Sequence, residues 1–525
     1  MLVLLAGSLL PASADPTTAA NARISPVVRS GLASAGDAVF TAPGLRAQAP
    51  RLTAAQRLRL EQGLNEDRIV PQTPEDPGAS LSGSAPMVAS TRVPESGAAA
   101  SPALPGDFAL SHSTDLGASK AALVAEPSVA RWNNLVFETW NWNAAVSTNG
   151  GSNFSFINPR TKFPSTWGGF CCDQVVYYSP THGIFVWAMM YNEDSHGNNG
   201  IRLAVTDTAG LATGAFWYWD ITPKQLGLKS GINYDQPDIA GSDNFLYLEV
   251  EEFNANKGDR YNKWSDVMRF GLDDLVAKAG LPYYAYSTPL FAPGMTSGAH
   301  ATMYFAGHVD SDTLRVFSWP ESVSSTGVTS VDVDHSAYPR NTPYRCPRLF
   351  APKANWCARA DDRITNGWVA GGVLGFHWNA SQGSGGLGVF PYPYDHVVRL
   401  NETTKALLSE PIIWSSDVAW IYGAVSPNAR GDLGGSILYG GGLYRQSCAV
   451  LLWDWNSGGF WQTPYGVASD SDPNQPVGGD YLSSYPNAGN SNTWSATCYT
   501  LQGGGDNRNV HPWYLSFGRA GDAPA

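Results

Sequence analysis

Short runs of hydrophobic and aromatic residues recur along the chain from about residue 131 to the C-terminus, and turn residues separate them. Examples are Leu135-Val-Phe-Glu-Thr, Ile184-Phe-Val-Trp-Ala-Met-Met-Tyr and Phe245-Leu-Tyr-Leu-Glu-Val. Their length, their β-branched and aromatic residues and the flanking Gly, Pro, Asn and Asp are typical of β-strands. The pattern therefore predicts an all-β domain over residues 128–525.

The strand patterns fall into about seven groups at intervals of roughly 55 residues. Such a repeat fits small sheets arranged in a ring, because one sheet cannot bury both faces without neighbours. We therefore expect a single β-propeller of about seven four-stranded blades, and six to eight blades also fit the pattern. The first and last groups are incomplete, so we expect them to combine strands and close the ring. A β-sandwich would explain less well the acidic residues that recur at the blade entries, which are Asp173, Asp238, Asp362 and Asp480.

The N-terminal part differs in composition from this domain. Residues 15–127 are rich in Ala, Pro, Ser, Thr and Gly and contain almost no aromatic residues, so we expect a disordered segment that is dispensable for the fold. One short helix is predicted within it, because Thr53-x-x-Gln56 forms a capping box and the hydrophobic pattern ends at Gly63. It is either a docking helix, part of a removable pro-segment, or marginal local order.

The first residues predict export. Residues 1–14 form an apolar run that ends in Ala12-Ser13-Ala14 before Asp15, which is the pattern of a signal peptide, although a basic n-region is missing. No later segment approaches the roughly 18 to 20 apolar residues that span a bilayer. We therefore expect a secreted, extracellular protein without a membrane span.

Composition and charge limit the partners. The chain has 19 Trp, 23 Tyr and 20 Phe, only 15 % charged residues and a net charge of −12. Nucleic-acid binding relies on clustered Lys and Arg, so we expect no nucleic-acid partner. We expect a monomer.

Six cysteines fit an oxidising compartment. Cys346 and Cys357 bracket a Pro- and Arg-rich loop, and we expect a disulfide between them. Cys448 and Cys498 each lie in a strand-like run, so they either pair between blades or are buried as small apolar residues. Cys171 and Cys172 are adjacent. No Cys-x-x-Cys pair occurs, which makes a structural zinc site unexpected.

One motif resembles a known superfamily. Ser147, Asn149, Gly151 and Phe154 occupy the four positions of Ser-x-Asp-x-Gly-x-x-Trp, the Asp-box of sialidase-like (BNR repeat) propellers, with Asn in place of Asp and Phe in place of Trp. The motif is a tight hairpin and carries no chemistry, so the resemblance implies the fold. Sialidases of this superfamily have an Arg-Ile-Pro motif with the first catalytic arginine. The motif is missing here, so we do not expect a standard sialidase.

Candidate catalytic residues lie where the inner strands begin. A ring of carboxylates there would bind Ca²⁺ or supply the acid and base of a glycosidase, which makes Asp173, Asp238 and Asp362 candidates. The alternative, which we favour for each residue taken singly, is that the Asp accepts hydrogen bonds in a turn. His300 is a candidate general base, with the same structural alternative. No cofactor is expected apart from Ca²⁺.

Two polar loops suggest a ligand. Arg430, Arg508 and Trp513, together with Asp480, could grip and stack on sugar rings, although hairpin tips have the same residues. Gly-x-Ser-x-Gly, His-Glu-x-x-His and phosphate-loop motifs are missing. The sequence therefore predicts a secreted propeller that binds or cleaves an extracellular glycan or polysaccharide, as a glycoside hydrolase or a polysaccharide lyase. The alternative is a non-catalytic propeller for adhesion, envelope structure or protein interaction.

Overall fold

A computed structural model describes most of the predicted β domain. It covers residues 108–117, 121, 124–254, 264–278, 280–340, 342–348, 351, 354–415, 417–453, 461–474, 479–506 and 509–522, and the backbone of 27–38 and 91–92. The predicted signal peptide and the predicted helix near residues 53–63 lie outside the described residues.

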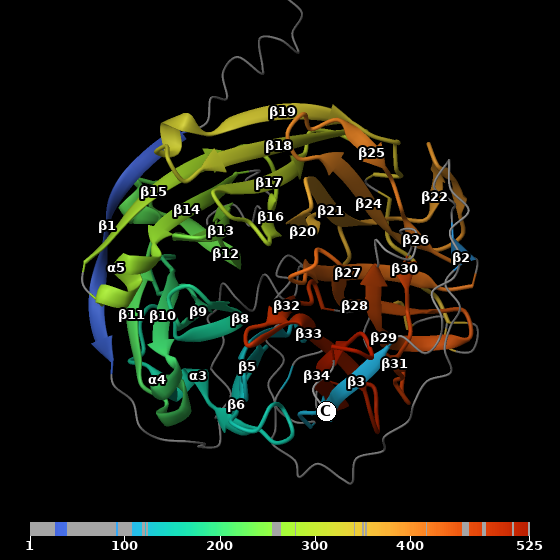
Figure 1. The fold of residues 1–525 in the computed structure, drawn as a ribbon, viewed down its shortest axis with the longest axis horizontal. Coiled ribbons are helices and arrows are strands. Elements are labelled where there is room, and N and C mark those ends of the chain that lie inside the picture. Colours follow the sequence, from blue (N-terminus) through green and yellow to red (C-terminus); the bar gives the residue numbers. More distant parts are fainter. Residues whose placement is uncertain are drawn as a thin grey trace, which may run out of the picture.

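The first half of the domain consists of successive antiparallel groups of strands around a common centre (Figure 1). The strands are β4 (Ser128–Trp132), β5 (Leu135–Trp140), β6 (Asn143–Ser147) and β7 (Ser155–Ile157); β8 (Phe170–Ser179), β9 (Ile184–Tyr191), β10 (Ile201–Asp207) and β11 (Phe216–Ile221); β12 (Ile232–Gly241), β13 (Phe245–Asn254), β14 (Ser265–Gly271) and β15 (Leu281–Thr288); β16 (Gly294–Ser297), β17 (Thr302–His308), β18 (Thr313–Pro320) and β19 (Thr329–Asp334).

The second half continues the same arrangement. Its strands are β20 (Ile364–Ala370), β21 (Val373–Ala380), β24 (Tyr394–Asn401), β25 (Leu407–Ser409) and β26 (Ile413–Trp414), with the hairpin β22 (Gly383–Gly385) and β23 (Gly388–Phe390); β27 (Ala419–Pro427), β28 (Leu433–Gly441), β29 (Tyr444–Trp453), β30 (Trp461–Gln462) and β31 (Gly466–Val467); β32 (Ser484–Asn487), β33 (Asn490–Leu501) and β34 (Val510–Gly518). The helices are short: α3 (Pro159–Lys162), α4 (Thr208–Thr213), α5 (Leu272–Ala277), η1 (Pro223–Leu226) and η2 (Ser325–Gly327).

The first strands of these groups form a closed ring. Around the ring each contacts the next, in the order β4, β8, β12, β16, β20, β27, β32 and back to β4. The remaining strands of each group run outward from this ring (Figure 1). This radial arrangement is that of a β-propeller, as the repeat predicts. Its inner strands surround an axis at which loops from several groups converge.

The last sheet is completed by a strand that precedes the predicted domain boundary. β3 (Ala109–Asp115) pairs antiparallel with β34, from Ala109 opposite Gly518 to Asp115 opposite Trp513. The last sheet therefore includes residues before position 128, and the first and last groups do not share strands, because β4–β7 form their own sheet. The sequence of β3 is Ala-Leu-Ser-His-Ser-Thr-Asp, which has too few apolar residues to signal a strand.

Two further segments from the predicted disordered region also form strands. β1 (Val27–Ala38) pairs antiparallel with both β11 and β15, and β2 (Thr91–Arg92) pairs with β26. β1 joins the outer edges of two groups of strands, whereas β2 extends the sheet that contains β24 and β26 at its edge. Composition predicts disorder throughout residues 15–127, whereas parts of this segment form strands.

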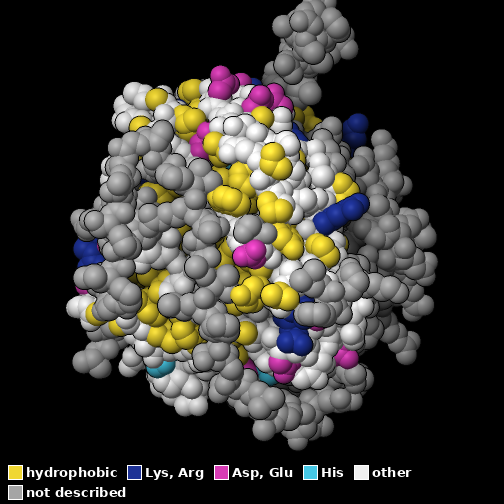
Figure 2. All heavy atoms as spheres, turned by 90° about the vertical axis from the view of Figure 1, so that its right-hand side faces the viewer, with side chains coloured by type: hydrophobic (Ala, Val, Ile, Leu, Met, Phe, Trp, Pro, Cys, Tyr) yellow, Lys and Arg dark blue, Asp and Glu magenta, His cyan; other side chains and the backbone are white. Residues whose placement is uncertain are grey.

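Large aromatic side chains fill the spaces inside and between the sheets. The fully buried tryptophans are Trp140, Trp142, Trp187, Trp219, Trp319, Trp356, Trp368, Trp378, Trp420, Trp453 and Trp494. Facing sheets of a propeller diverge toward the outside, and large rings fill that widening space. Figure 2 shows that uncharged and hydrophobic groups dominate one side of the surface and that charged side chains are few among the described residues on view.

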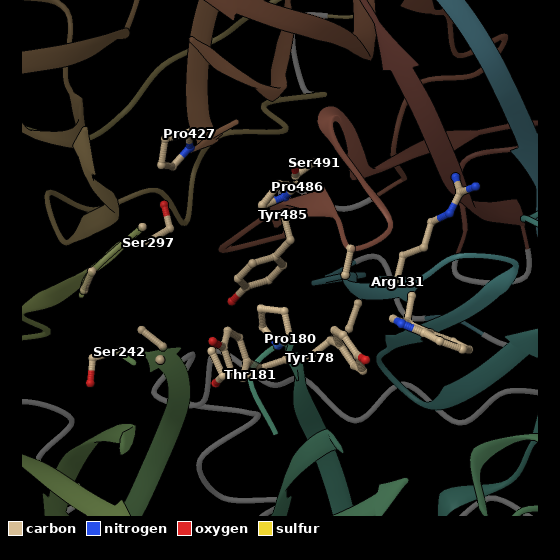
Figure 3. A pocket seen from close by; sticks show the side chains of 18 of the residues that line it. Arg131, Tyr178, Pro180, Thr181, Ser242, Ser297, Pro427, Tyr485, Pro486 and Ser491 are labelled. Carbon is tan, nitrogen blue, oxygen red and sulfur yellow. The ribbon is translucent and has the colours of Figure 1, made fainter. Parts of the chain in front are cut away.

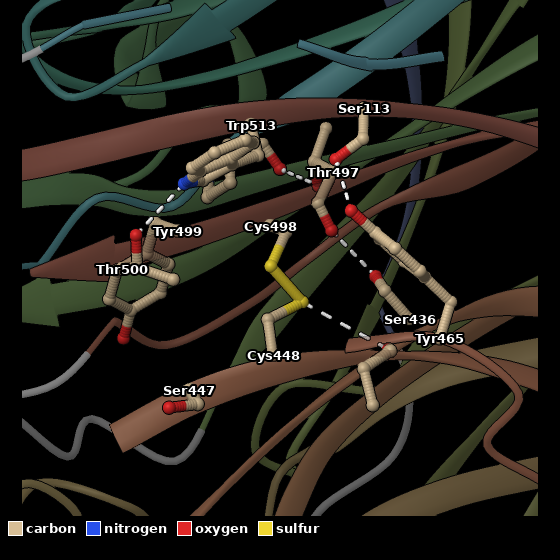
Figure 4. The surroundings of a disulfide bond; sticks show 12 residues. Ser113, Ser436, Ser447, Cys448, Tyr465, Thr497, Cys498, Tyr499, Thr500 and Trp513 are labelled. Atoms are coloured by element: carbon tan, nitrogen blue, oxygen red, sulfur yellow. Dashed lines mark hydrogen bonds between the residues drawn. A yellow bond between two sulfur atoms is a disulfide. The ribbon is translucent and has the colours of Figure 1, made fainter. Parts of the chain in front are cut away.

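The six cysteines form three disulfides. Cys346–Cys357 closes the Pro- and Arg-rich loop and confirms the predicted pairing. Cys448 of β29 and Cys498 of β33 join two neighbouring sheets, which decides between the two readings of this pair (Figure 4). Cys171 is bonded to the adjacent Cys172. Three disulfides fit an oxidising, extracellular environment.

The turn between β6 and β7 has the geometry that its motif predicts. Ser147 Oγ accepts a hydrogen bond from the Gly151 amide at 2.9 Å, and Asn149 Oδ1 accepts one from the Asn153 amide at 3.0 Å. Gly151 has a φ of +101° and lies against the ring of Tyr514, where a Cβ atom would be only 2.0 Å from the nearest ring carbon. The glycine is therefore required both by its backbone conformation and by the close approach of the ring.

Replacing Gly151 by Ala should lower the free energy of unfolding by about 2 kcal/mol or more, because a clash adds to the strain of the positive φ. Thermal and urea denaturation measure the change. Gly150→Ala is the matched control: Gly150 has a φ of +78°, but its nearest neighbour would lie 3.6 Å away. Equal losses in the two variants would contradict the role assigned to the Tyr514 contact.

Candidate functional site

The inner strands share an unusual backbone feature near their beginnings. Five non-glycine residues there have φ between +40° and +60°: Glu126, Cys172, Gln236, Ala292 and Tyr422. The pairing register shifts around three of them, in β8, β12 and β27. Such bulges point side chains in directions that a regular strand does not allow. A positive φ at a non-glycine residue also strains the backbone. Strained, bulged backbone thus recurs at this end of the inner strands, and strain of this kind clusters at functional sites.

An acidic pocket of about 80 Å³ lies at this end of the inner strands. Asp238 of β12 and Glu249 of β13 line it from directly opposite positions of the paired strands. Glu251 also lines it, because residues two apart in a strand face the same side. With Asp480, four carboxyl groups thus line one pocket. Other lining residues are Gln236, Arg363, Tyr481 and Tyr485.

The protein environment raises the pKa of three of these carboxyl groups. Asp238 is exposed to the pocket but deep within the protein, and burial raises its pKa to about 7. Burial raises the pKa of Glu251 to about 8, although Arg363 opposes the shift. Burial, followed by the charges of Glu251 and Asp238, raises the pKa of Glu249 well above its ordinary value. Near neutral pH the pocket therefore contains both protonated and ionised carboxyl groups.

Arg363 is the cation nearest to these groups among the described contacts. Its Nε and Nη2 donate to the Asp361 carboxylate at 2.8 and 2.6 Å, which fixes the guanidinium plane. Its Nη1 lies 3.9 Å from Glu251 Oε1. On the other wall, Asp480 is 1 % exposed and lies 3.3 Å from Arg359 Nη2. The pocket therefore contains a proton donor, a proton acceptor and a fixed positive charge.

The predicted site residues divide between this pocket and other places. Asp238 and Asp480 line the pocket. Asp173 is fully buried in β8, where Asn141 Nδ2 lies 3.5 Å from its Oδ1. Asp362 accepts a hydrogen bond from Tyr338 at 2.7 Å and forms an ion pair with Arg340 at 2.6 Å. The structure thus assigns no common site to the four aspartates.

The remaining predicted residues lie away from the acidic pocket. Arg430 pairs with Asp432 and Asp522 at a hairpin tip, at 3.2 and 2.6 Å. Trp513 is 6 % exposed, donates to Thr500 Oγ1 at 2.8 Å and lies near the Cys448–Cys498 disulfide (Figure 4). Arg508 lies outside the described residues. These contacts favour the structural reading for Arg430 and Trp513.

Sequence reasoning missed Glu249, Glu251 and Arg363. A signal for the two glutamates existed, because Leu248-Glu-Val-Glu-Glu alternates charges with apolar residues in a strand that otherwise reads as buried. Buried strands seldom carry carboxylates on one face unless these have a partner or a function. Arg363 follows Asp362 directly, so the side chain that lines the pocket is the neighbour of the predicted one.

A second cavity, of about 470 Å³, lies at the other end of the inner strands. Figure 3 shows Tyr485 reaching into it, with Tyr178 and Pro180 on one wall and Ser297 and Pro427 on another. Tyr485 also lines the acidic pocket. His300 lies on the rim of the large cavity, 83 % exposed, with Nδ1 2.9 Å from Asp243 Oδ1. His300 is therefore not placed with the acidic carboxyl groups, and the larger cavity lacks their paired chemistry.

Glu251→Gln should make the protein more stable at pH 8 by about 1 kcal/mol or more. Between its ordinary pKa of 4.5 and its folded pKa of about 8, Glu251 keeps a proton that the unfolded chain loses, so the free energy of unfolding falls as the pH rises through this window. The amide removes that dependence. Melting temperatures at pH 5 and pH 8 measure it, with the exposed Asp273→Asn as control. A variant that is less stable than the wild type at both pH values would indicate a purely structural carboxylate.

No protein-family model and no curated protein sequence matches this chain. Solved structures match at low identity. An α-L-arabinofuranosidase of Fusarium graminearum, in complex with an iminosugar inhibitor, is 10 % identical, with 76 % of this chain and 94 % of that chain covered and a TM-score of 0.35. The NanB sialidase of Streptococcus pneumoniae is 10 % identical, with 74 % and 82 % covered and a TM-score of 0.36. The SapL1 lectin with α-methyl fucoside is 11 % identical, with 67 % and 98 % covered and a TM-score of 0.35.

Among the described residues, no helix has the length and apolar character needed to cross a membrane. The helices are single turns or two turns between strands.

Proposed function

We propose that this protein is a secreted glycoside hydrolase that cleaves an extracellular glycan in the acidic pocket. The observation that carries the proposal is the meeting of Asp238, Glu249 and Glu251, all with raised pKa, in one pocket that solvent reaches. Perturbed titratable groups in a cleft are typical of acid–base catalysis. Glycoside hydrolysis in particular uses two carboxyl groups in different protonation states.

The proposed roles follow from the protonation state of each carboxyl group near neutral pH. Glu251, still protonated at neutral pH, donates its proton to the glycosidic oxygen as the bond from the anomeric carbon to that oxygen breaks. Asp238, ionised above about pH 7, accepts a proton from the water that attacks the anomeric carbon. Burial and the neighbouring carboxyl groups raise the pKa of Glu249, which favours its uncharged form beside Glu251. Tyr481 and Tyr485 offer ring faces on which a sugar can stack.

The wider architecture is part of the proposal. The inner-strand ring of the described residues has seven members, which supports a seven-bladed propeller. The net charge of −12 and the three disulfides support a secreted protein with a glycan rather than a nucleic acid as partner. A monomer stays a prediction, which light scattering coupled to gel filtration tests. Calcium binding by the pocket carboxyl groups also stays a prediction, tested by adding calcium or EDTA to the assay below.

The test is the release of reducing ends from a panel of plant, fungal, bacterial and animal polysaccharides, with product analysis by mass spectrometry. The wild type should release oligosaccharides from at least one class, and Asp238→Asn should not. Asp362→Asn is the matched control, because that carboxylate is bound by Tyr338 and Arg340 outside the pocket lining. Equal activity of the wild type and Asp238→Asn would overturn the assignment of the site.

Non-catalytic binding is the second candidate, and the larger cavity favours it. That cavity is lined by Trp132, Tyr177, Tyr178 and Tyr485 and is about six times larger than the acidic pocket, at 470 against 80 Å³. If the protein only binds glycans, an array should detect ligands that the panel shows to be uncleaved. Tyr178→Ala should then abolish binding, and Asp238→Asn should leave it unchanged.

A further inference from the structure

A second group of titratable side chains lies away from the acidic pocket. His335 follows β19 directly, His396 lies in β24, and Glu410 follows β25. One nitrogen of each histidine and one oxygen of the carboxylate all lie within 4.8 Å of one another. The three residues come from two neighbouring groups of strands. The folded chain therefore brings together a donor set that has no motif in the sequence.

His335 presents a free lone pair to this cluster. Its Nδ1 lies 3.0 Å from the Ser336 carbonyl oxygen. A carbonyl only accepts, so Nδ1 carries the proton and Nε2 carries the lone pair. His335 is 8 % exposed, and its Nε2 is buried without a hydrogen-bond partner. A buried polar atom without a hydrogen-bond partner lowers the stability of the folded protein by about 1–3 kcal/mol, so a ligand bound to this nitrogen would stabilise the fold.

The other two donors are held in place for the same ligand. His396 Nε2 lies 2.8 Å from Glu410 Oε2. The Glu410 carboxylate accepts from the Ser336 amide at 3.1 Å and from Ser336 Oγ at 2.7 Å. Ser336 therefore orients both His335 and Glu410, in the manner of the hydrogen bonds that surround metal ligands. Donors bound tetrahedrally to zinc lie about 3.3 Å apart, which small side-chain rotations reach from the present distances.

Aromatic rings fix the orientation of the imidazoles. Trp378 stacks on His396, with ring centroids 4.3 Å apart and planes at 17°. Tyr338 lies nearly parallel to His335, with centroids 6.1 Å apart and planes also at 17°. The two imidazoles are thus buried and held between aromatic rings before any ligand arrives. Two imidazole nitrogens and one carboxylate oxygen are the donors of zinc, whereas calcium takes oxygen ligands only.

We propose that His335, His396 and Glu410 bind one zinc ion, with the fourth position taken by water. The ion links the beginning of the long connection between β19 and β20, which also contains the Cys346–Cys357 disulfide, to the neighbouring sheet of β24. It stabilises the folded protein and takes no part in the proposed glycan cleavage. The inference is independent of the acidic pocket.

The test uses the full chain without an affinity tag. After treatment with EDTA and dialysis, zinc titration followed by calorimetry and elemental analysis should show one equivalent bound, and zinc should raise the melting temperature by several degrees. His335→Gln and Glu410→Gln should each weaken zinc binding at least about tenfold. His300→Gln is the control, because His300 is exposed and pairs with Asp243 outside this cluster.

A readout on the wild type guards against variants that do not fold. Cobalt in place of zinc should give the visible absorption of a tetrahedral site, and X-ray absorption of the zinc protein should show scattering from two imidazoles. Binding of much less than one equivalent, or a zinc spectrum without imidazole ligands, would overturn the proposal. So would folded His335→Gln and Glu410→Gln variants that bind zinc as tightly as the wild type.

Discussion

Replacing Asp238 by Asn, or Glu251 by Gln, should lower kcat for glycan cleavage by roughly 10²–10⁴-fold, the usual contribution of a positioned general acid or base. KM should change little, because neither substitution alters the size of the side chain. The loss is expected for Asp238 because an Asn side chain cannot accept the proton from the attacking water, and for Glu251 because the leaving oxygen would depart unprotonated. Steady-state kinetics on the polysaccharide found in the panel measures both.

The pH dependence of the activity distinguishes a catalytic role of these two residues from a structural one. Activity needs Asp238 ionised and Glu251 protonated, so it should rise as the pH passes about 7 and fall as it passes about 8. Because the carboxyl groups interact, the two limbs belong to the cluster as a whole. The residual activity of Asp238→Asn should lose the acidic limb, and that of Glu251→Gln the alkaline limb. Unchanged limbs in both variants would show that other groups carry the protons.

Removing residues 1–127 should destabilise the propeller by at least about 3 kcal/mol or prevent it from folding, whereas removing residues 1–107 should leave β3 and its contacts in place. The shorter fragment loses the strand that pairs along β34. It also loses two contacts that fix β3: the Asp115 carboxylate lies 2.7 Å from His511 Nδ1, and Tyr465 donates to Ser113 Oγ at 2.9 Å. An unpaired β34 would expose an open sheet edge.

Fragments 108–525 and 128–525 provide a matched comparison, because both lack β1 and β2 and differ only in the segment that contains β3. Urea denaturation gives the difference in the free energy of unfolding, and gel filtration shows whether the exposed edge causes association. Equal stability of the two fragments would contradict the role of β3 in completing the last sheet.

The local features that the sequence predicted correctly depend on neighbours in the chain. Strand patterns, the turn at Ser147–Phe154 and the Cys346–Cys357 loop are determined by residues a few positions apart, whose side chains and φ preferences act before any tertiary contact forms. β3 was missed because its stability comes from pairing with a strand almost 400 residues later, and its own residues carry little apolar signal.

The chain by itself thus determined the all-β class, the repeat that closes into a ring, the aromatic core and one disulfide, since periodicity and turn chemistry act over short distances. Only the tertiary structure decided which polar groups meet. Asp238, Glu249 and Glu251 share a pocket because β12 and β13 pair in one register, while Asp173 and Asp362 lie in different surroundings. His335, His396 and Glu410 converge because two neighbouring sheets pack together. A pKa near 7 for a carboxyl group likewise arises from burial, which exists only once distant segments exclude water from the same place.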